Sequence, residues 1–199
     1  ADVVLAGGTP VFVPLRPTPG GSSSSDWALD PNELRRAITP RTKMIIVNTP
    51  HNPVGKIFSR KELEDIAKIA IEHDLLVISD EVYETIVYDD APSKHISIGT
   101  QIGLFICLSH GHNTVASLPG MWERTVTIGS VGKMFSATGG KVGWIVGNEE
   151  LIRATWMVHQ FITFAVNTPL QEAVAEALEK AATSNYFDET AKSTLSMEK

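Results

Sequence analysis

Residues 43–83 read KMIIVNTPHNPVGKIFSRKELEDIAKIAIEHDLLVISDEVY, and this stretch decides the fold. Residues 43–47 and 75–79 are short apolar runs of the kind found in buried strands. Between them, Ser59 is expected to begin an amphipathic helix, because Glu62 follows at the capping-box position and apolar residues then recur on one face. Continuous apolar strands joined through a helix predict an α/β fold, with a mostly parallel sheet covered by helices on both faces.

The pattern extends toward the N-terminus with weaker signals. Residues 9–14 alternate enough to predict a strand, and residues 17–25 are rich in Pro, Gly and Ser, as in a solvated loop. Asp30 is expected to cap a helix that has Pro31 at its first position and Glu33 in a capping-box arrangement.

Toward the C-terminus the pattern continues with two further strands and two helices. The strands are expected at residues 125–128 and 142–146, and the helices near residues 149–159 and 169–182. No internal repeat of fixed period interrupts this order.

Composition excludes several classes of protein. The 199 residues include 17 Lys and Arg against 23 Asp and Glu, a net charge of −6, so nucleic acid is not the expected main partner. No apolar run approaches the roughly 20 residues that span a bilayer, so no membrane association is expected. The single cysteine, Cys107, excludes an internal disulfide and a cysteine-cluster metal site.

Polar clusters follow three of the expected strands, where ligands bind in parallel sheets. They are NTPHNPVG at residues 48–55, SDEVY at 79–83 and GSVGK at 129–133. Each cluster alone has an ordinary explanation: a turn, a helix cap by Asp80, or a solvated surface Lys133. Together they predict one cleft that holds a carboxylate, hydroxyls and an amine, which are the groups that a pyridoxal phosphate site requires.

The motifs NTPHNPVGK, SDEVYE and TIGSVGKMFSATGGKVGW resemble those of aminotransferases with the type I pyridoxal phosphate fold. His51 favours the branch of kynurenine aminotransferases, glutamine transaminase K and cysteine-conjugate β-lyases. The similarity covers nearly the whole chain apart from residues 101–117 and the last dozen.

The resemblance implies a role for each matching residue around the cofactor ring. Lys133 would hold pyridoxal 5′-phosphate through an imine and, once released, move the proton at the substrate α-carbon. Asp80 would pair with the pyridine nitrogen and keep it protonated. Asn52 and Tyr83 would donate hydrogen bonds to the ring 3′-oxygen.

The resemblance also implies phosphate ligands, with one departure from the family. Ser130 and Lys141 would bind the phosphate. Relatives usually have an aromatic residue before this second lysine, whereas here Gly139 and Gly140 precede it. An aromatic residue near Phe164 reaches the partner subunit's site in relatives, so a homodimer is implied for the full-length parent.

The implied activity is transfer of an amino group from an amino acid such as kynurenine or glutamine to a 2-oxo acid, with cysteine-conjugate β-lyase chemistry as a side activity. A cytoplasmic location is expected, with a mitochondrial one as the alternative. Two rival readings are a truncated, inactive fragment of such an enzyme and a serine acyl-transferase that uses Ser130 with Lys133. The second lacks the companion Ser-Asp-Asn and Lys-Thr-Gly motifs.

The chain is expected to be part of a longer protein, since it begins at Ala1 without an initiator methionine. Residues 1–182 would form part of the large cofactor-binding domain. Residues 183–199 would begin the connection to a C-terminal small domain.

Residues 101–117 form an anomalous insertion with neither loop chemistry nor a regular period. They would be a retained non-coding stretch or gene-model error, or a tolerated surface insertion. A metal site built from Cys107, His110 and His112 is a third reading, weakened by the absence of a fourth ligand.

Overall fold

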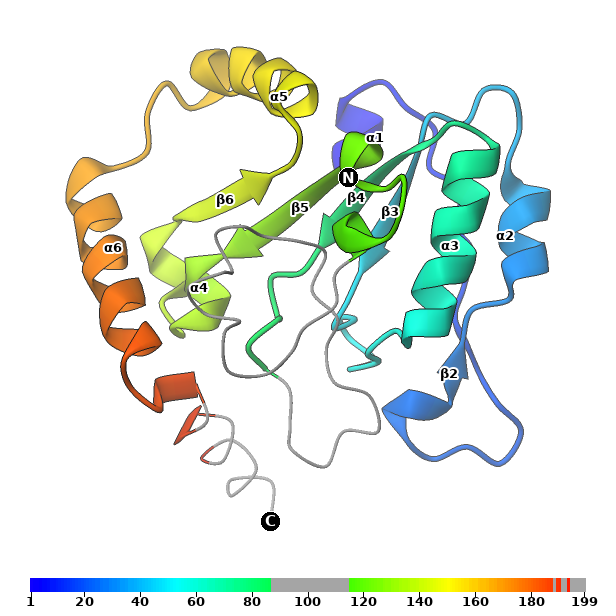
Figure 1. The fold of residues 1–199 in the computed structure, drawn as a ribbon, viewed down its shortest axis with the longest axis horizontal. Helices are drawn as coiled ribbons and strands as arrows, with labels where there is room; N and C mark the ends of the chain where they lie inside the picture. The colour runs from blue at the N-terminus through cyan, green and yellow to red at the C-terminus, as the bar shows by residue number, and fades with distance from the viewer. Residues whose placement is uncertain (87–114, 188, 191–192, 194–199) are drawn as a thin grey trace.

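The computed structural model describes residues 1–86, 115–187, 189–190 and 193, and its centre is a four-stranded sheet (Figure 1). The strands are β3 (Met44–Asn48), β4 (Leu76–Asp80), β5 (Thr125–Ser130) and β6 (Gly143–Val146), in that spatial order. The first three are parallel, and β6 runs antiparallel to β5. The predicted α/β class with a mostly parallel sheet is confirmed.

The register brings the carboxyl ends of the strands to one edge of the sheet. Asn48 lies opposite Asp80, and Asp80 lies opposite Ile128 on β5. Ser130, two residues further along β5, lies opposite Gly143 of β6. The three polar clusters that follow β3, β4 and β5 therefore start from neighbouring positions.

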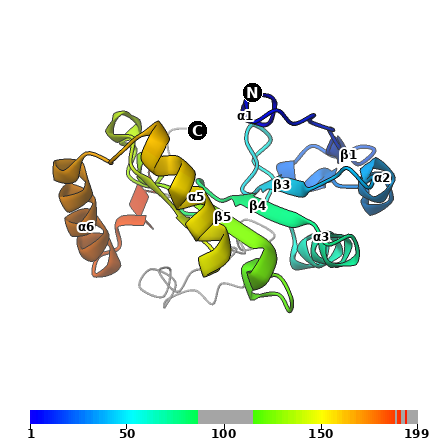
Figure 2. The same ribbon diagram turned by 90° about the horizontal axis from the view of Figure 1, so that it is seen from above.

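Helix α3 (Arg60–Glu72) covers one face of the sheet beside β3 and β4 (Figures 1 and 2). Its predicted capping box is confirmed: the Ser59 hydroxyl accepts from the Glu62 backbone N–H, and the Glu62 carboxylate accepts from the Ser59 N–H. The helix buries five side chains that the apolar period predicts: Leu63, Ile66, Ala67, Ile69 and Ala70.

Helix α2 (Pro31–Ala37) starts as predicted, but one detail of the prediction is wrong. The Asp30 side chain accepts from the Asn32 N–H, with Pro31 at the first position. Glu33 does not complete a capping box. Its carboxylate instead forms an ion pair with Arg16, because the N-terminal segment places a guanidinium within its reach.

The strand predicted at residues 9–14 is also wrong. These residues have no strand structure; the strands in this region are β1 (Arg16–Pro17) and β2 (Trp27–Ala28), which pair antiparallel. Pro10 and Pro14 lack the N–H groups that a ladder needs. Val13 instead packs, partly buried, against the hydrophobic core.

Short helical elements and two longer helices complete the described chain. They are α1 (Asp2–Leu5), η1 (Ser24–Asp26), η3 (Val115–Ser117), η4 (Trp122–Arg124), α4 (Val131–Met134), η5 (Thr138–Gly140), α5 (Glu149–Ile162) and α6 (Thr168–Ala182). The last two confirm the predicted C-terminal helices. Helix α6 lies beyond the β6 edge of the sheet (Figure 1). No helix in the described ranges is long and apolar enough to cross a membrane.

The hydrophobic core lies between α3 and the sheet, and the opposite face of β3 and β4 is more open. Val47 and Val77 are 6% and 1% exposed, whereas Met44, Ile46 and Leu76 are 43%, 52% and 38% exposed. Successive strand side chains point to opposite faces. The described residues therefore bury one apolar face of these two strands and leave the other partly open.

Candidate functional site

The chain that follows β3 folds back into a loop of residues 48–58. The His51 N–H donates to the Lys56 carbonyl at 2.8 Å, and the Gly55 N–H donates to the His51 carbonyl at 2.7 Å. Gly55 adopts φ +74°, a left-handed conformation that glycine accepts without strain. This turn presents Asn52 at its exposed tip.

Asn48 ties the loop to the next strand with both ends of its side chain. Its Nδ2 donates to the Asp80 carbonyl at 3.0 Å, and its Oδ1 accepts from the Asn52 N–H at 2.7 Å. Asn48 was not among the predicted site residues. Its position as the last residue of the strand is the signal that could have identified it.

The two carboxylates at the carboxyl end of β4, Asp80 and Glu81, occupy different environments. Asp80 is half-buried, and its Oδ1 accepts from the Val82 N–H at 3.4 Å, at the start of a turn rather than a helix. Glu81 is 1% exposed and accepts a hydrogen bond from the Ser79 hydroxyl at 3.0 Å. Asp80, the predicted site residue, is thus the more accessible of the two.

Two predicted site residues, Asn52 and Lys133, contact a third, Tyr83. The Asn52 Nδ2 donates to the Tyr83 hydroxyl at 3.0 Å. The Lys133 ammonium lies 5.7 Å from the centroid of the Tyr83 ring, within the range of a cation–π interaction. The structure therefore brings together side chains from the three segments that follow β3, β4 and β5.

Ser130 and Lys141 lie on the β5–β6 side of the same strand ends. Ser130 precedes α4 without making a side-chain cap, so no described helix N–H binds its hydroxyl. The Val131 N–H donates to the Val142 carbonyl at 3.1 Å, which brings the chain around Lys141 next to Ser130. Lys141 is exposed, with φ +52°.

Gly129 and Trp144 fit together directly beside Ser130. A Cβ atom placed on Gly129 would lie 2.3 Å from Cε2 of the Trp144 indole. Only glycine lets this ring lie across the end of β5, so the pair fixes the backbone from which Lys133 starts.

His51 lies in the same loop but is not joined to the site by its side chain. Its Nδ1 is buried and has no hydrogen-bond partner among the described residues. Burial lowers the pKa of His51 below its ordinary value of 6.5.

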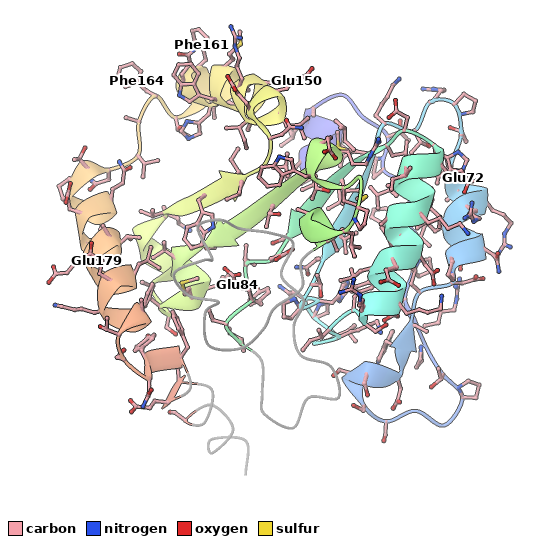
Figure 3. The ribbon with its side chains drawn as sticks, viewed as in Figure 1. Glu72, Glu84, Glu150, Phe161, Phe164 and Glu179 are labelled. Carbon is pink, nitrogen blue, oxygen red and sulfur yellow. The ribbon has the colours of Figure 1, made fainter. Side chains whose placement is uncertain are left out.

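Phe164 lies away from the residues around Tyr83. It is 90% exposed, with φ +62°, and Figure 3 shows it beside α5, away from Glu84 in the turn that follows β4. The structure therefore does not join Phe164 to the residues around Tyr83 within one chain.

The described part of the chain holds no group of three or more His, Cys, Asp or Glu side chains that could bind a metal ion. The hypothetical metal site of Cys107, His110 and His112 lies outside the described residues, as does most of the 101–117 insertion.

Known proteins show the same sequence pattern and fold. The family model "Aminotransferase class I and II" matches residues 1–199. Kynurenine–oxoglutarate transaminase 1 of Mus musculus is 49% identical over 181 residues, and kynurenine–oxoglutarate transaminase 3 of Homo sapiens is 49% identical over 178 residues. These alignments cover 89% and 88% of this chain but 38% and 35% of the relatives.

A solved structure agrees with this relationship. N-succinyldiaminopimelate aminotransferase from Mycobacterium tuberculosis superposes with a TM-score of 0.77 at 38% identity, over 96% of this chain and 43% of that one. The chain spans well under half of the length of these proteins. The family match over the full chain, together with the shared fold, shows that the chain belongs to the class I and II aminotransferases.

Proposed function

We propose that this chain carries most of the cofactor-binding part of a pyridoxal phosphate-dependent aminotransferase. One observation supports this proposal above the others: the Lys133 amine lies against the ring of Tyr83, whose hydroxyl is bound by Asn52. An amine from α4, a phenol from the turn after β4 and an amide from the loop after β3 meet where ligands bind in parallel sheets.

The donor set of the site fits pyridoxal 5′-phosphate. The half-buried Asp80 carboxylate suits the protonated ring nitrogen, and Asn52 and Tyr83 suit the ring oxygen. The Ser130 hydroxyl, unused in capping, and the exposed Lys141 suit the phosphate. When bound, the cofactor supplies an electron sink for the carbanion at the substrate α-carbon.

The residues of this chain would then perform the remaining steps. Lys133 Nζ would hold the cofactor, and as a free amine it would take the proton from the substrate α-carbon and return it during transfer. Asp80 would keep the ring nitrogen protonated, because an adjacent carboxylate favours the charged form. Tyr83, held by Asn52, would orient the ring oxygen.

The names of the relatives support kynurenine as the amino donor and a 2-oxo acid as the acceptor. In the parent protein, an amino acid such as kynurenine or glutamine would donate the amino group, and a 2-oxo acid would accept it. Elimination from cysteine conjugates would be a side activity of the same carbanion chemistry. A cytoplasmic location remains part of the proposal.

Residues 1–182 are proposed to belong to the large domain, with residues 183–199 leading toward a small domain. The end of the described chain packs near the site: Phe135 lies 5.4 Å and 5.7 Å, centroid to centroid, from Tyr186 and Phe187. Because Phe135 follows α4, these contacts join the chain beyond α6 to the helix that carries Lys133.

We also propose that the parent forms a homodimer. Helix α5 leaves large apolar side chains in solvent, among them Trp156, Phe161 and Ile162 at 61%, 86% and 74% exposed. Exposed apolar surface of this kind marks association sites.

The test of the proposed function is the visible absorption spectrum of the purified chain with added pyridoxal phosphate. A lysine-dependent band is expected in the wild type and in Lys68→Ala, an exposed α3 control, but not in Lys133→Ala. A band that survives Lys133→Ala would refute the assignment of that residue. A folded chain without a band would favour the inactive-fragment reading, and labelling of Ser130 by a β-lactam would favour the acyl-transferase.

A further inference from the structure

Next to the loop that presents Asn52, the buried Lys56 forms an ion pair with the partly buried Glu62. Lys56 is 4% exposed, and its Nζ lies 2.9 Å from Oε1 of Glu62 and 5.4 Å from the centroid of the Phe58 ring. Burying a charge is costly unless it is paired, so the Glu62 carboxylate stabilises Lys56 in its buried position.

Glu62 uses its second oxygen for another purpose. Its Oε2 accepts from both the N–H and the hydroxyl of Ser59 at 2.9 Å, which completes the capping box of α3. The carboxylate therefore connects Lys56 to the first turn of a helix whose buried face forms the core.

Lys56 connects in turn to Asn52 through the backbone. The Lys56 carbonyl accepts the His51 N–H, and the His51 carbonyl accepts the Gly55 N–H, so Asn52 lies inside a closed turn. The side chain of Asn52 then reaches the Tyr83 hydroxyl. An uninterrupted series of contacts runs from α3 to the Asn52–Tyr83 hydrogen bond.

We propose that Lys56 and Glu62 are positioning residues that hold the turn of residues 51–55, and thereby the Asn52 amide, against Tyr83. This inference rests on the proposed function for its consequence, which is tighter binding of pyridoxal phosphate. The structural part, an ordered turn that depends on the Lys56–Glu62 ion pair, is independent of the cofactor.

The first test is amide hydrogen exchange in the 199-residue chain without cofactor. In Lys56→Met, exchange at the His51 and Gly55 amides is expected to accelerate at least about tenfold, while amides in the last turn of α3 keep their rates. Lys61→Met is the matched control, because Lys61 forms an exposed ion pair with Asp65 on α3, the helix that also carries Glu62. Equal acceleration throughout α3, or unchanged rates at the turn, would refute the proposal.

The second test is the affinity for pyridoxal phosphate, measured by equilibrium dialysis. Lys56→Met is expected to weaken binding at least tenfold, or about 1.4 kcal/mol, whereas Lys56→Arg, which keeps the charge, should bind nearly as well as the wild type. Glu62→Gln can still cap Ser59 but leaves Lys56 unpaired, so it should resemble Lys56→Met.

The outcomes separate this proposal from the proposed function. If Lys56→Met and Glu62→Gln bind the cofactor normally while Lys133→Ala loses its band, the aminotransferase site stands and the positioning role is wrong. If the wild type forms no band, the exchange rates at His51 and Gly55 still decide whether Lys56 holds the turn.

Discussion

Helices α3 and α5 look alike in sequence but differ in what they contact. Each is amphipathic, and each has a side-chain N-cap: Ser59 accepts from the Glu62 N–H, and Asn148 accepts from the Leu151 N–H at 3.0 Å. Yet α3 buries five residues in the core, whereas α5 has no buried residue. Figure 3 shows Phe161 projecting away from the rest of the ribbon.

The difference teaches that a helix follows from local sequence, whereas burial requires a second surface. Helix α3 finds that surface on β3 and β4, and each buried leucine or isoleucine side chain there contributes about 1.5–3 kcal/mol. The described residues offer α5 no comparable surface. Its exposed apolar side chains thus contribute little to the stability of this chain.

The sharpest test of this contrast is truncation of one apolar side chain in each helix. Leu63→Ala removes a side chain that is 2% exposed and is expected to lower the free energy of unfolding by about 2–5 kcal/mol. Phe161→Ala removes one that is 86% exposed and should change it by less than about 0.5 kcal/mol. Urea unfolding measures both, and equal losses would contradict the contrast.

Two glycines near the site offer a second comparison. Gly129→Ala would force a methyl group into the Trp144 indole and is expected to destabilise the chain by about 1–3 kcal/mol. Gly140→Ala meets nothing within 4 Å and needs no left-handed backbone, so it should stabilise the chain by about 0.4–1 kcal/mol. Thermal unfolding of both variants checks the signs; destabilisation by Gly140→Ala would show that the glycine pair has a structural role.

Self-association tests the proposed dimer contact through α5. Phe161→Glu is expected to weaken dimerisation at least tenfold, or about 1.4 kcal/mol, because it places a charge within the exposed apolar face. Phe12→Glu is the control, since Phe12 is equally exposed, at 85%, but lies near the N-terminus. Sedimentation over a range of concentrations measures both; an equal response of the two variants would argue against an α5 interface.

The smallest expected effect concerns His51. Burial lowers its pKa, so the folded state disfavours the protonated ring. Above the ordinary pKa of 6.5 the ring is neutral in both states, so the folded chain keeps its full stability. As the pH falls below 6.5, protonation favours the unfolded chain and this stability is lost. The free energy of unfolding should thus decline less between about pH 7.5 and about pH 5.5 in His51→Asn than in the wild type. Parallel pH profiles would exclude His51 as the source.

Local patterns in the sequence were enough to predict most of the secondary structure. The α3 capping box, its buried face and the apolar strands β3 to β6 all match the prediction within one or two residues. The reason is that capping and periodic burial depend on residues a few positions apart. Recognition of the aminotransferase motifs rested on the same short stretches.

In two other segments, contacts with distant parts of the chain produced a structure that the local sequence pattern did not predict. Residues 9–14 have an alternating pattern, but two prolines and a core position for Val13 leave them outside any sheet. Glu33 had the spacing of a capping residue, yet Arg16 binds its carboxylate. Neither outcome can be derived from neighbours in the sequence, because each depends on a partner that the fold brings close.

In the candidate site, too, local sequence predicted some features and only tertiary contacts decided the others. Its residue types were predictable, since an amine, a carboxylate and hydroxyls follow the strands of a parallel sheet. The Asn52–Tyr83 hydrogen bond joins residues 31 positions apart, and the roles of Asn48 and of the Lys56–Glu62 pair were not foreseen. Short-range energetics set the helices and strands, whereas hydrogen bonds and buried charges between loops exist only after the sheet has brought those loops together.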